Sequence, residues 1–317
     1  MATTKNITMK QFNGTDYDTL YPKTIASQVD GLSQILVTTH PNTEVTASLN
    51  DKTVSVMSDS SGLAVLKITG YGTWTVTATV DGAFVSRNCE IKAVAQYELT
   101  LVPELETTSW DDISAISERG IASSVFSVGD KKHVIIDGVD YLTQIIGFDH
   151  DTKTSGGKAG ITFQLVNCLK TRYKMNSSNT NNGGWQNCAM RTSTMATLLT
   201  KLPSALQNVI KAVNKQTSAG NQSSTISTTS DKLFLLSEVE VFGTTTHSKS
   251  GEGKQYDYYR AGNSTIKWID VGINAWVWWE RSPASGDNSK FCSVDRDGNA
   301  DISNASYTDG VSFAFCV

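Results

Sequence analysis

The chain lacks several features that would decide its class at once. No run of about eighteen apolar residues occurs, so a membrane-spanning helix is not expected. Charged residues make up only 18% of the 317 residues, against about 25% in typical globular domains. No phosphate-binding glycine loop, Gly-x-Ser-x-Gly or His-Glu-x-x-His pattern is present. These absences remove the common signatures of P-loop nucleotide enzymes, serine hydrolases and metalloproteases.

A strong positive charge is also missing. The net charge is −4, which favours neither nucleic acid nor an anionic membrane as a partner. The opening residues, Met1 to Asn6, lack the apolar stretch of a secretory signal. We therefore expect synthesis and folding in a cytoplasm, with no insertion into a membrane.

The cysteines are few and odd in number. None forms a Cys-x-x-Cys pair, so a zinc site is not expected. Buried free thiols are the favoured interpretation, because cysteine packs as a small apolar residue. Pairing of Cys168 with Cys188, or of Cys292 with Cys316, stays open, and the fifth cysteine is Cys89.

Three segments follow one another along the chain. Residues 1–32 contain an alternating strand at Ile7–Phe12, the turn Asn13-Gly14 and a second apolar stretch from Tyr17. This segment is too short to bury its own apolar side chains. We predict an arm that attaches the chain to another protein or joins copies of it.

Residues 33–97 predict a small all-β domain. Six or seven short β-branched runs are separated by turn residues such as Asn50-Asp51 and Asp81-Gly82, a spacing typical of a β-sandwich. Alternate residues from Trp74 to Val80 are apolar, so one face of that strand is predicted to be buried.

Residues 98–317 predict a mixed α+β domain with long loops. Ser109 and Asp112 indicate a helix N-terminus, and Gly120 its end. Asp137-Gly138 indicates a hairpin between two apolar strands. Further predicted elements are a strand at 161–166, helices around 195–202 and 206–210, and core strands at 234–236 and 239–241.

The last forty residues carry the main functional signal. Apolar ends at 278–283 and 310–317 enclose a polar stretch of short side chains and one tyrosine. This chemistry is that of binding loops, in which Tyr supplies contact area and Asn or Ser adaptable hydrogen bonds. The predicted ligand-binding residues are Trp279, Glu280, Asp287, Asn288, Lys290, Asp295, Asp297, Asn299, Asp301, Asn304, Ser306, Tyr307 and Asp309.

Two neighbouring features have competing interpretations. Trp276 and Trp278 share a strand face and are predicted to be core, while Trp279 could stack on a sugar. Arg281 could bind an acidic ligand, but a buried guanidinium tied to a carboxylate or to carbonyls is favoured.

Metal and catalytic sites are not predicted. The run from Asp295 to Asp301 could bind calcium, but Gly298 falls at the wrong position for an EF-type loop, so an Asp-Gly hairpin turn is favoured. His150 lies between Asp149 and Asp151 but has no evident second ligand. We therefore expect no catalytic residue, no metal and no cofactor.

Several blocks of the C-terminal domain form a distinctive set: Ile145–Asp151, Met175–Asn181, Cys188–Arg191, Ser230–Glu238 and Trp278–Pro283. With these blocks, the domain resembles a family of uncharacterised domains found in phage tail proteins and in surface proteins of Gram-positive gut bacteria. This family looks like a variant of the C-type lectin fold, shared with formylglycine-generating enzymes and retroelement variable proteins. The resemblance implies that residues 280–312 bind a ligand. Glu280 departs from the expected Leu, and we expect it to be exposed.

The other two segments also carry resemblances. With its residues Asn6–Lys10, Asn13–Asp18 and Leu20–Thr24, the arm is similar to the start of tail-fibre-like proteins from phages of Firmicutes. The middle domain looks immunoglobulin-like or prealbumin-like in its general pattern. The expected fold is thus multidomain: an arm at 1–32, an all-β immunoglobulin-like sandwich at 33–97, and an α+β C-type-lectin-like domain at 98–317.

These resemblances imply a virion structural protein, a tail fibre or receptor-binding adhesin made in the host cytoplasm. Its partners would be other virion proteins through the arm, and a host surface glycan or protein through residues 280–312. A homotrimer is expected, since fibres are commonly trimers. Alternatives are a capsid decoration (head fibre) protein, a formylglycine-generating-like enzyme or glycan hydrolase, and a bacterial surface adhesin.

Overall fold

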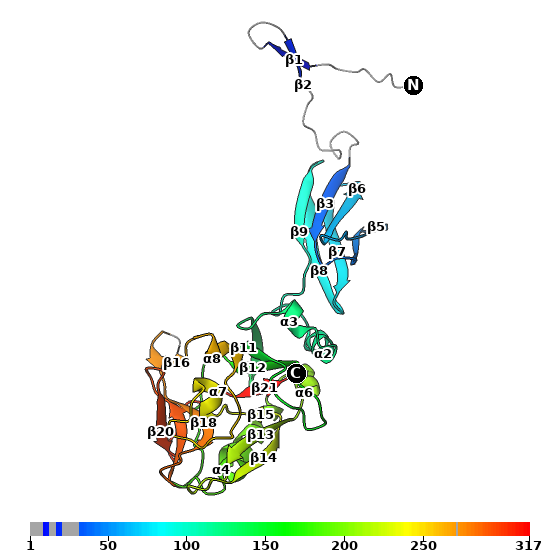
Figure 1. Cartoon of the computed structure of the whole chain (residues 1–317). Coiled ribbons are helices and arrows are strands. Elements are labelled where there is room, and N and C mark those ends of the chain that lie inside the picture. The colour runs from blue at the N-terminus through cyan, green and yellow to red at the C-terminus, as the bar shows by residue number, and fades with distance from the viewer. Residues whose placement is uncertain (1–8, 13–16, 21–31, 271) are drawn as a thin grey trace. The chain divides into compact units, whose positions relative to one another are not determined.

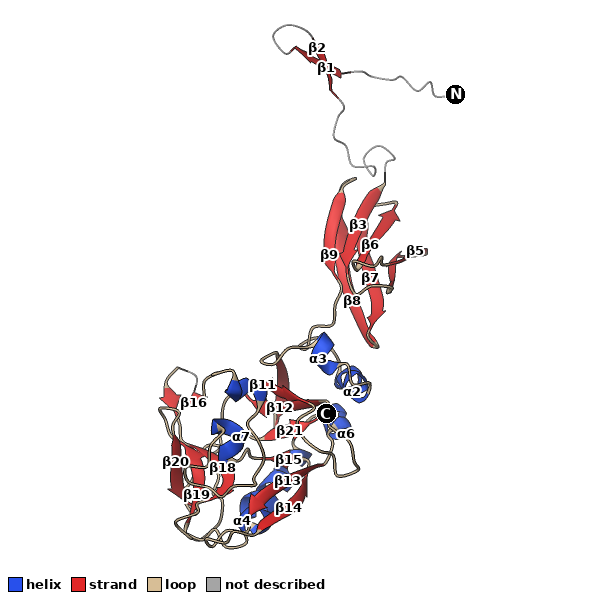
Figure 2. Cartoon of the chain, viewed as in Figure 1, coloured by secondary structure: helices blue, strands red, loops and turns tan. Residues whose placement is uncertain are grey.

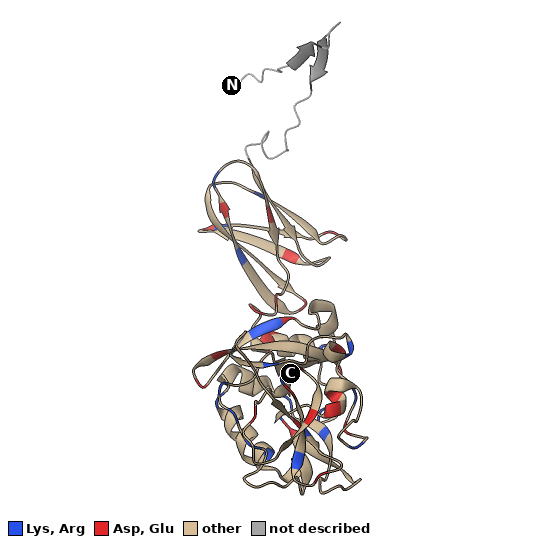
Figure 3. Cartoon of the chain, turned by 90° about the vertical axis from the view of Figure 1, so that its left-hand side faces the viewer, with Lys and Arg blue, Asp and Glu red and all other residues tan. Residues whose placement is uncertain are grey.

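The computed structural model describes the backbone of residues 9–12, 17–20, 32–270 and 272–317, and side chains from residue 32 onward except Asp270 and Val271. The chain is rich in β-structure and separates into two compact units (Figures 1 and 2). The first comprises residues 1–80 and 84–102, and the second residues 81–83 and 103–317. Basic and acidic residues are interspersed in both units (Figure 3).

The described part of the arm is a short antiparallel pair, β1 (Met9–Phe12) and β2 (Tyr17–Leu20). This pair confirms the predicted strand. The turn Asn13-Gly14 and residues 21–31 lie outside the described part, so the role predicted for the arm stays a prediction.

Two sheets enclose one core in the first unit. The strands, in chain order, are β3 (Ser33–Thr38), β4 (Glu44–Leu49), β5 (Lys52–Met57), β6 (Leu63–Ile68), β7 (Gly72–Val80), β8 (Ala83–Ile91) and β9 (Gln96–Thr100). One sheet has the order β6-β3-β9 and the other β5-β4-β7-β8. Trp74, Val76, Ala78 and Val80 are all buried, as their alternation predicts.

Two expectations for this unit need correction. The predicted boundary at residue 97 cuts β9, which pairs in parallel with β3 up to Thr100, so the strand belongs to this unit. The strand order also differs from that of an immunoglobulin constant domain, in which the first, second, fifth and fourth strands form one sheet. Here the first strand, β3, instead pairs with the fourth and the last, β6 and β9.

A five-stranded sheet forms the centre of the second unit. Its order is β10-β11-β12-β21-β15, so the C-terminal strand β21 lies inside the sheet. These strands are β10 (Lys131–Ile136), β11 (Val139–Phe148), β12 (Ile161–Leu165), β15 (Leu233–Phe234) and β21 (Ala314–Cys316). Phe163 and Phe315 stack 5.3 Å apart between β12 and β21. Full burial of a side chain of this size contributes roughly 1.5–3 kcal/mol.

Short helices pack around this sheet. They are α2 (Trp110–Glu118), α3 (Ala122–Val125), α4 (Gly184–Asn187), the π-helical turn η1 (Met190–Met195), α5 (Ala196–Thr200), α6 (Ser204–Val209), α7 (Glu238–Phe242) and α8 (Asp257–Arg260). Ser109 caps α2 by accepting a hydrogen bond from the amide of Asp112, as predicted. The strand predicted at 239–241 is wrong, because a capping box between Ser237 and Glu240 starts α7 there.

Three small sheets complete the second unit. One is the hairpin of β13 (Val213–Ser218) and β14 (Ile226–Asp231), and another pairs β16 (Trp268–Asp270) with β17 (Asn274–Ala275). The third has the order β18 (Trp278–Pro283), β19 (Lys290–Val294) and β20 (Ala300–Asn304), drawn in orange to red in Figure 1. The predicted binding region consists of this third sheet and of the loops that join and follow its strands.

Candidate functional site

The predicted binding residues lie on one hairpin and the loops at its ends. β19 and β20 pair antiparallel, with Lys290 opposite Asn304 and Val294 opposite Ala300. At the surface or partly exposed are Asp287, Asn288, Lys290, Asp295, Asp297, Asn299, Asp301, Asn304, Ser306 and Tyr307. Tyr307 is 57% exposed, the largest exposed aromatic of this region. We call these ten residues the display face.

Three residues predicted for this face are buried. Trp279 and Glu280 are 0% exposed, because β18 is covered at every position. The Trp279 indole donates to the carbonyl of Tyr173 at 2.8 Å, which makes it a core residue. Asp309 is only 8% exposed and accepts a hydrogen bond from Ser303 Oγ at 2.7 Å. The structure therefore contradicts the prediction that these three side chains are displayed at the surface, although Asp309 lines a shallow hollow.

The prediction that Trp276 and Trp278 are both core residues is confirmed for Trp278 and wrong for Trp276. Trp278 is fully buried, as predicted, and its indole donates to the carbonyl of Thr265 at 3.0 Å. Trp276 was also expected in the core, but it is partly exposed. It lies before β18, so the strand alternation used to place it does not apply.

A buried asparagine fixes the loop between β18 and β19. The Asn181 side chain donates to the carbonyls of Asp287 and Lys290 at 2.8 and 2.7 Å. Its Oδ1 accepts a hydrogen bond from the backbone amide of Asn221 at 2.7 Å. The backbone amide of Asn181 donates to the carbonyl of Asn288 at 2.8 Å. Asn181 is 0% exposed and joins three loops distant in sequence. The sequence placed it in a matching block but indicated no role for it.

The tip of the hairpin is an Asp-Gly turn, as favoured over a calcium loop. Asp295 Oδ1 accepts from the amides of Asp297 and Asn299 at 2.9 and 2.8 Å. Gly298 has φ +87°, a conformation that favours glycine. The carboxylate therefore stabilises the turn with the lone pairs that a metal would need.

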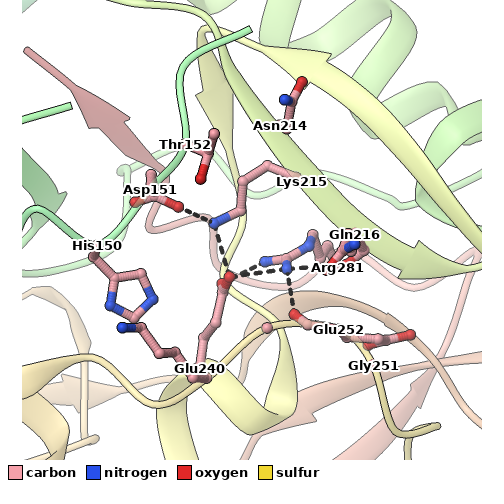
Figure 4. A pocket seen from close by; sticks show the side chains of 12 residues that line it. His150, Asp151, Thr152, Asn214, Lys215, Gln216, Glu240, Gly251, Glu252 and Arg281 are labelled. Carbon is pink, nitrogen blue, oxygen red and sulfur yellow. Dashed lines mark hydrogen bonds and ion pairs between the residues drawn. The ribbon is translucent and has the colours of Figure 1, made fainter. Parts of the chain in front are cut away.

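Buried charged side chains that bind one another line a cavity of about 350 Å³ (Figure 4). Lys215 Nζ lies 2.7 Å from both Asp151 Oδ1 and Glu240 Oε1. Arg281 binds Glu240 and donates to the carbonyls of Leu235 and Glu252, which confirms the favoured interpretation of a buried guanidinium. Burial alone raises the pKa of Asp151, but the Lys215 ammonium outweighs it and the pKa lies below its usual value.

His150 belongs to this cavity, but its acidic neighbours are already occupied. Its imidazole stacks on Tyr256, with ring centroids 3.8 Å apart. Potential ligand atoms of His150, Asp151 and Glu240 lie within 4.8 Å of one another. The Lys215 ammonium bridges both carboxylates, so it stands where a metal cation would bind. The sequence could not indicate this cluster of charged side chains, because its members are spread along the chain from residue 150 to residue 281.

All five cysteines are free and buried. Burial raises the pKa of Cys168 and of Cys188 to about 12, and that of Cys292 and Cys316 well above the usual value. Such thiols are poorly ionised near neutral pH and are weak nucleophiles. The open disulfide alternatives are thus resolved in favour of free thiols.

One family matches the chain, a domain of unknown function (DUF6273), over residues 156–317. The match spans about half of the chain, and the protein belongs to this family through its second unit. No curated protein and no solved structure matches it. Within the described residues, no helix is long and apolar enough to cross a membrane.

Proposed function

We propose that this member of the family is a phage virion structural protein, a tail fibre or receptor-binding adhesin. Its second unit would recognise a host cell-surface molecule through the display face, and its arm would bind other virion proteins. The observation that carries the proposal is a solvent-exposed face of Asn, Asp, Ser and Tyr whose backbone is held by buried hydrogen bonds. Pre-organised polar loops of this kind lose little entropy on binding.

The proposed fold of the second unit is a variant of the C-type lectin fold. Its support is the C-terminal strand β21 inside the main sheet and the separate small sheet β18-β19-β20 that bears the loops. For the first unit we favour the prealbumin-like alternative over the immunoglobulin-like one. The reason is the pairing of β3 with β6 and β9, which an immunoglobulin constant domain does not have.

Several copies of the face would strengthen weak binding. We propose a homotrimer joined through the arm, since linked sites raise the apparent affinity without any new contact. The alternative of a capsid decoration protein uses the same architecture at another place on the particle. Electron microscopy with an antibody against the second unit would separate tail from capsid labelling.

An enzymatic alternative has less support. A formylglycine-generating-like oxidase would need reactive thiols, whereas all five cysteines are buried. A glycan hydrolase would need two carboxyl groups facing a cleft about 5–10 Å apart. The carboxylates of Asp151 and Glu240 face the cavity but are both bound by Lys215.

The proposal is tested by binding to intact cells. The full chain is biotinylated, presented on streptavidin, and measured by flow cytometry on a panel of Gram-positive gut bacteria. The test variant carries Asn288→Ala, Asn304→Ala and Tyr307→Ala, and a control variant carries Tyr71→Ala and Asn214→Ala at other exposed positions. We expect strain-selective binding that only the test variant loses. Absence of binding to every strain, with the chain folded, would contradict an adhesin of such hosts.

A further inference from the structure

Two arginines stack on one partly exposed tryptophan beside the display face. The guanidinium carbons of Arg172 and Arg296 lie 4.6 and 4.3 Å from the centroid of the Trp276 ring. Arg296 comes from the tip of the β19–β20 hairpin, and Arg172 precedes Tyr173, which pairs with Asp309. Segments more than one hundred residues apart thus bring two positive charges to one indole.

This pair is not explained by internal ion pairing. Neither guanidinium forms an ion pair or a hydrogen bond with any side chain that the structure describes, and both are exposed. Other arginines of the unit differ: Arg191 binds Asp231 at 2.6 Å, and Arg281 binds Glu240. Two like charges on one indole repel each other, and a bound anion would relieve this repulsion.

Asp309 interacts electrostatically with both arginines but is poorly suited to neutralise the pair. Asp309 is mostly buried and is hydrogen-bonded to Ser303 Oγ at 2.7 Å. Burial raises its pKa, although the hydrogen bond and the two arginines act in the opposite direction. The Asp309 carboxyl therefore gives the arginines a weaker counter-charge than an exposed carboxylate would.

The tryptophan is itself held in an unusual way. Its backbone amide donates to the carbonyl of Lys267 at 2.9 Å, but its indole nitrogen is buried without an acceptor among the described residues. A buried donor without a partner destabilises the fold by about 1–3 kcal/mol. The contacts that the ring does make are with the two guanidinium groups.

We propose that Arg172 and Arg296, oriented by Trp276, bind carboxylate or phosphate groups of an anionic cell-surface sugar polymer. This inference rests on the proposed function, because it names the class of ligand that the display face and the surface beside it would bind. Each guanidinium presents a planar fork of N–H donors that matches two oxygens of a carboxylate or phosphate. Stacking on the indole fixes the fork before the ligand arrives, so less rotamer entropy is lost on binding.

The neighbouring surface suits a polymer. Lys174, two residues along the chain from Arg172, lines a shallow hollow with Ser306, Tyr307 and Asp309. Tyr307 is exposed and can pack on a sugar ring while the arginines bind its acidic groups. Because these charges are exposed, added salt should weaken the binding.

The test uses the full chain on streptavidin and three immobilised probes: oligogalacturonate, oligo(glycerol phosphate) and neutral dextran. The variant Arg172→Gln with Arg296→Gln removes both charges, and Arg172→Lys with Arg296→Lys keeps the charge but not the fork. A control with Lys201→Gln and Lys232→Gln removes the same charge elsewhere on the unit. Biolayer interferometry at two salt concentrations gives the affinities.

We expect binding to one of the two anionic probes, which identifies carboxylate or phosphate as the preferred group, and none to dextran. The glutamine variant should lose at least about tenfold in affinity, the lysine variant less, and the control nothing. Binding to cells without binding to either anionic probe would overturn the inference and leave the adhesin proposal standing. Equal loss in the control would also overturn it, because the effect would then be net charge alone.

Discussion

Replacement of Glu280 by leucine should stabilise the protein. The Glu280 side chain is 0% exposed, and neither of its carboxyl oxygens has a hydrogen-bond partner among the described residues. Burial first, then the charges of Glu238 and Glu252, raise its pKa well above the usual value. A leucine has a similar volume and needs no partner, so the change removes a cost without opening a large cavity.

The size of the effect follows from two contributions. An unpartnered buried polar group costs about 1–3 kcal/mol, which gives about 2 kcal/mol for the neutral carboxyl. The folded state holds a proton that the unfolded state releases above pH 4.5, so the wild-type protein loses stability as the pH rises from there. The advantage of the leucine variant should therefore grow by up to about 1.4 kcal/mol for each pH unit until the folded carboxyl ionises.

Thermal unfolding at pH 5 and pH 8 measures both contributions. For a unit of this size, about 2 kcal/mol corresponds to an increase in Tm of roughly 4–8 °C. A Glu280→Gln variant separates them, since it removes the ionisation but keeps the unpartnered polar atoms. A lower Tm for the leucine variant at both pH values would refute the reasoning and indicate a partner for this carboxyl.

Three further results are expected. Lys215→Met should destabilise the second unit by about 3–5 kcal/mol in urea unfolding, because two buried carboxylates lose their shared cation; unchanged stability would contradict this. Asn181→Ala should speed hydrogen exchange in residues 284–290, where it removes bonds to two carbonyls, and exchange confined to other loops would count against that role. Burial raises the pKa of Glu252 to about 7, so the free energy of unfolding should fall as the pH rises from 4.5 to about 7. Glu252→Gln should make this pH dependence less steep in denaturation experiments across that range. An unchanged dependence would exclude Glu252 as its source.

Local signals in the sequence predicted local structure well. The cap at Ser109, the turn Asp137-Gly138 and the alternation from Trp74 to Val80 each depend on a few neighbouring residues, and the structure confirms them. The helix α7 was missed because its short apolar run fits a strand equally well. The capping box at Ser237 was the signal that would have distinguished the two.

Burial of polar residues could not be predicted from the sequence in the same way. Glu280 was placed at the surface because it departs from the leucine that the family resemblance leads one to expect, but every position of β18 is buried. Asn181, Lys215 and Arg172 acquire their roles from partners 25 to more than 100 residues away. Such sites depend on tertiary contacts, so composition and periodicity indicate the binding region but not the residues that support it.

The central claim is that the display face is the surface that contacts a host cell. Hydroxyl-radical footprinting of the full chain, free and bound to a strain that it labels, tests this claim directly. The account predicts protection of Tyr307 and neighbouring residues between 286 and 308, with little change on the first unit. Protection confined to the first unit, or to the cavity beside His150, would contradict it.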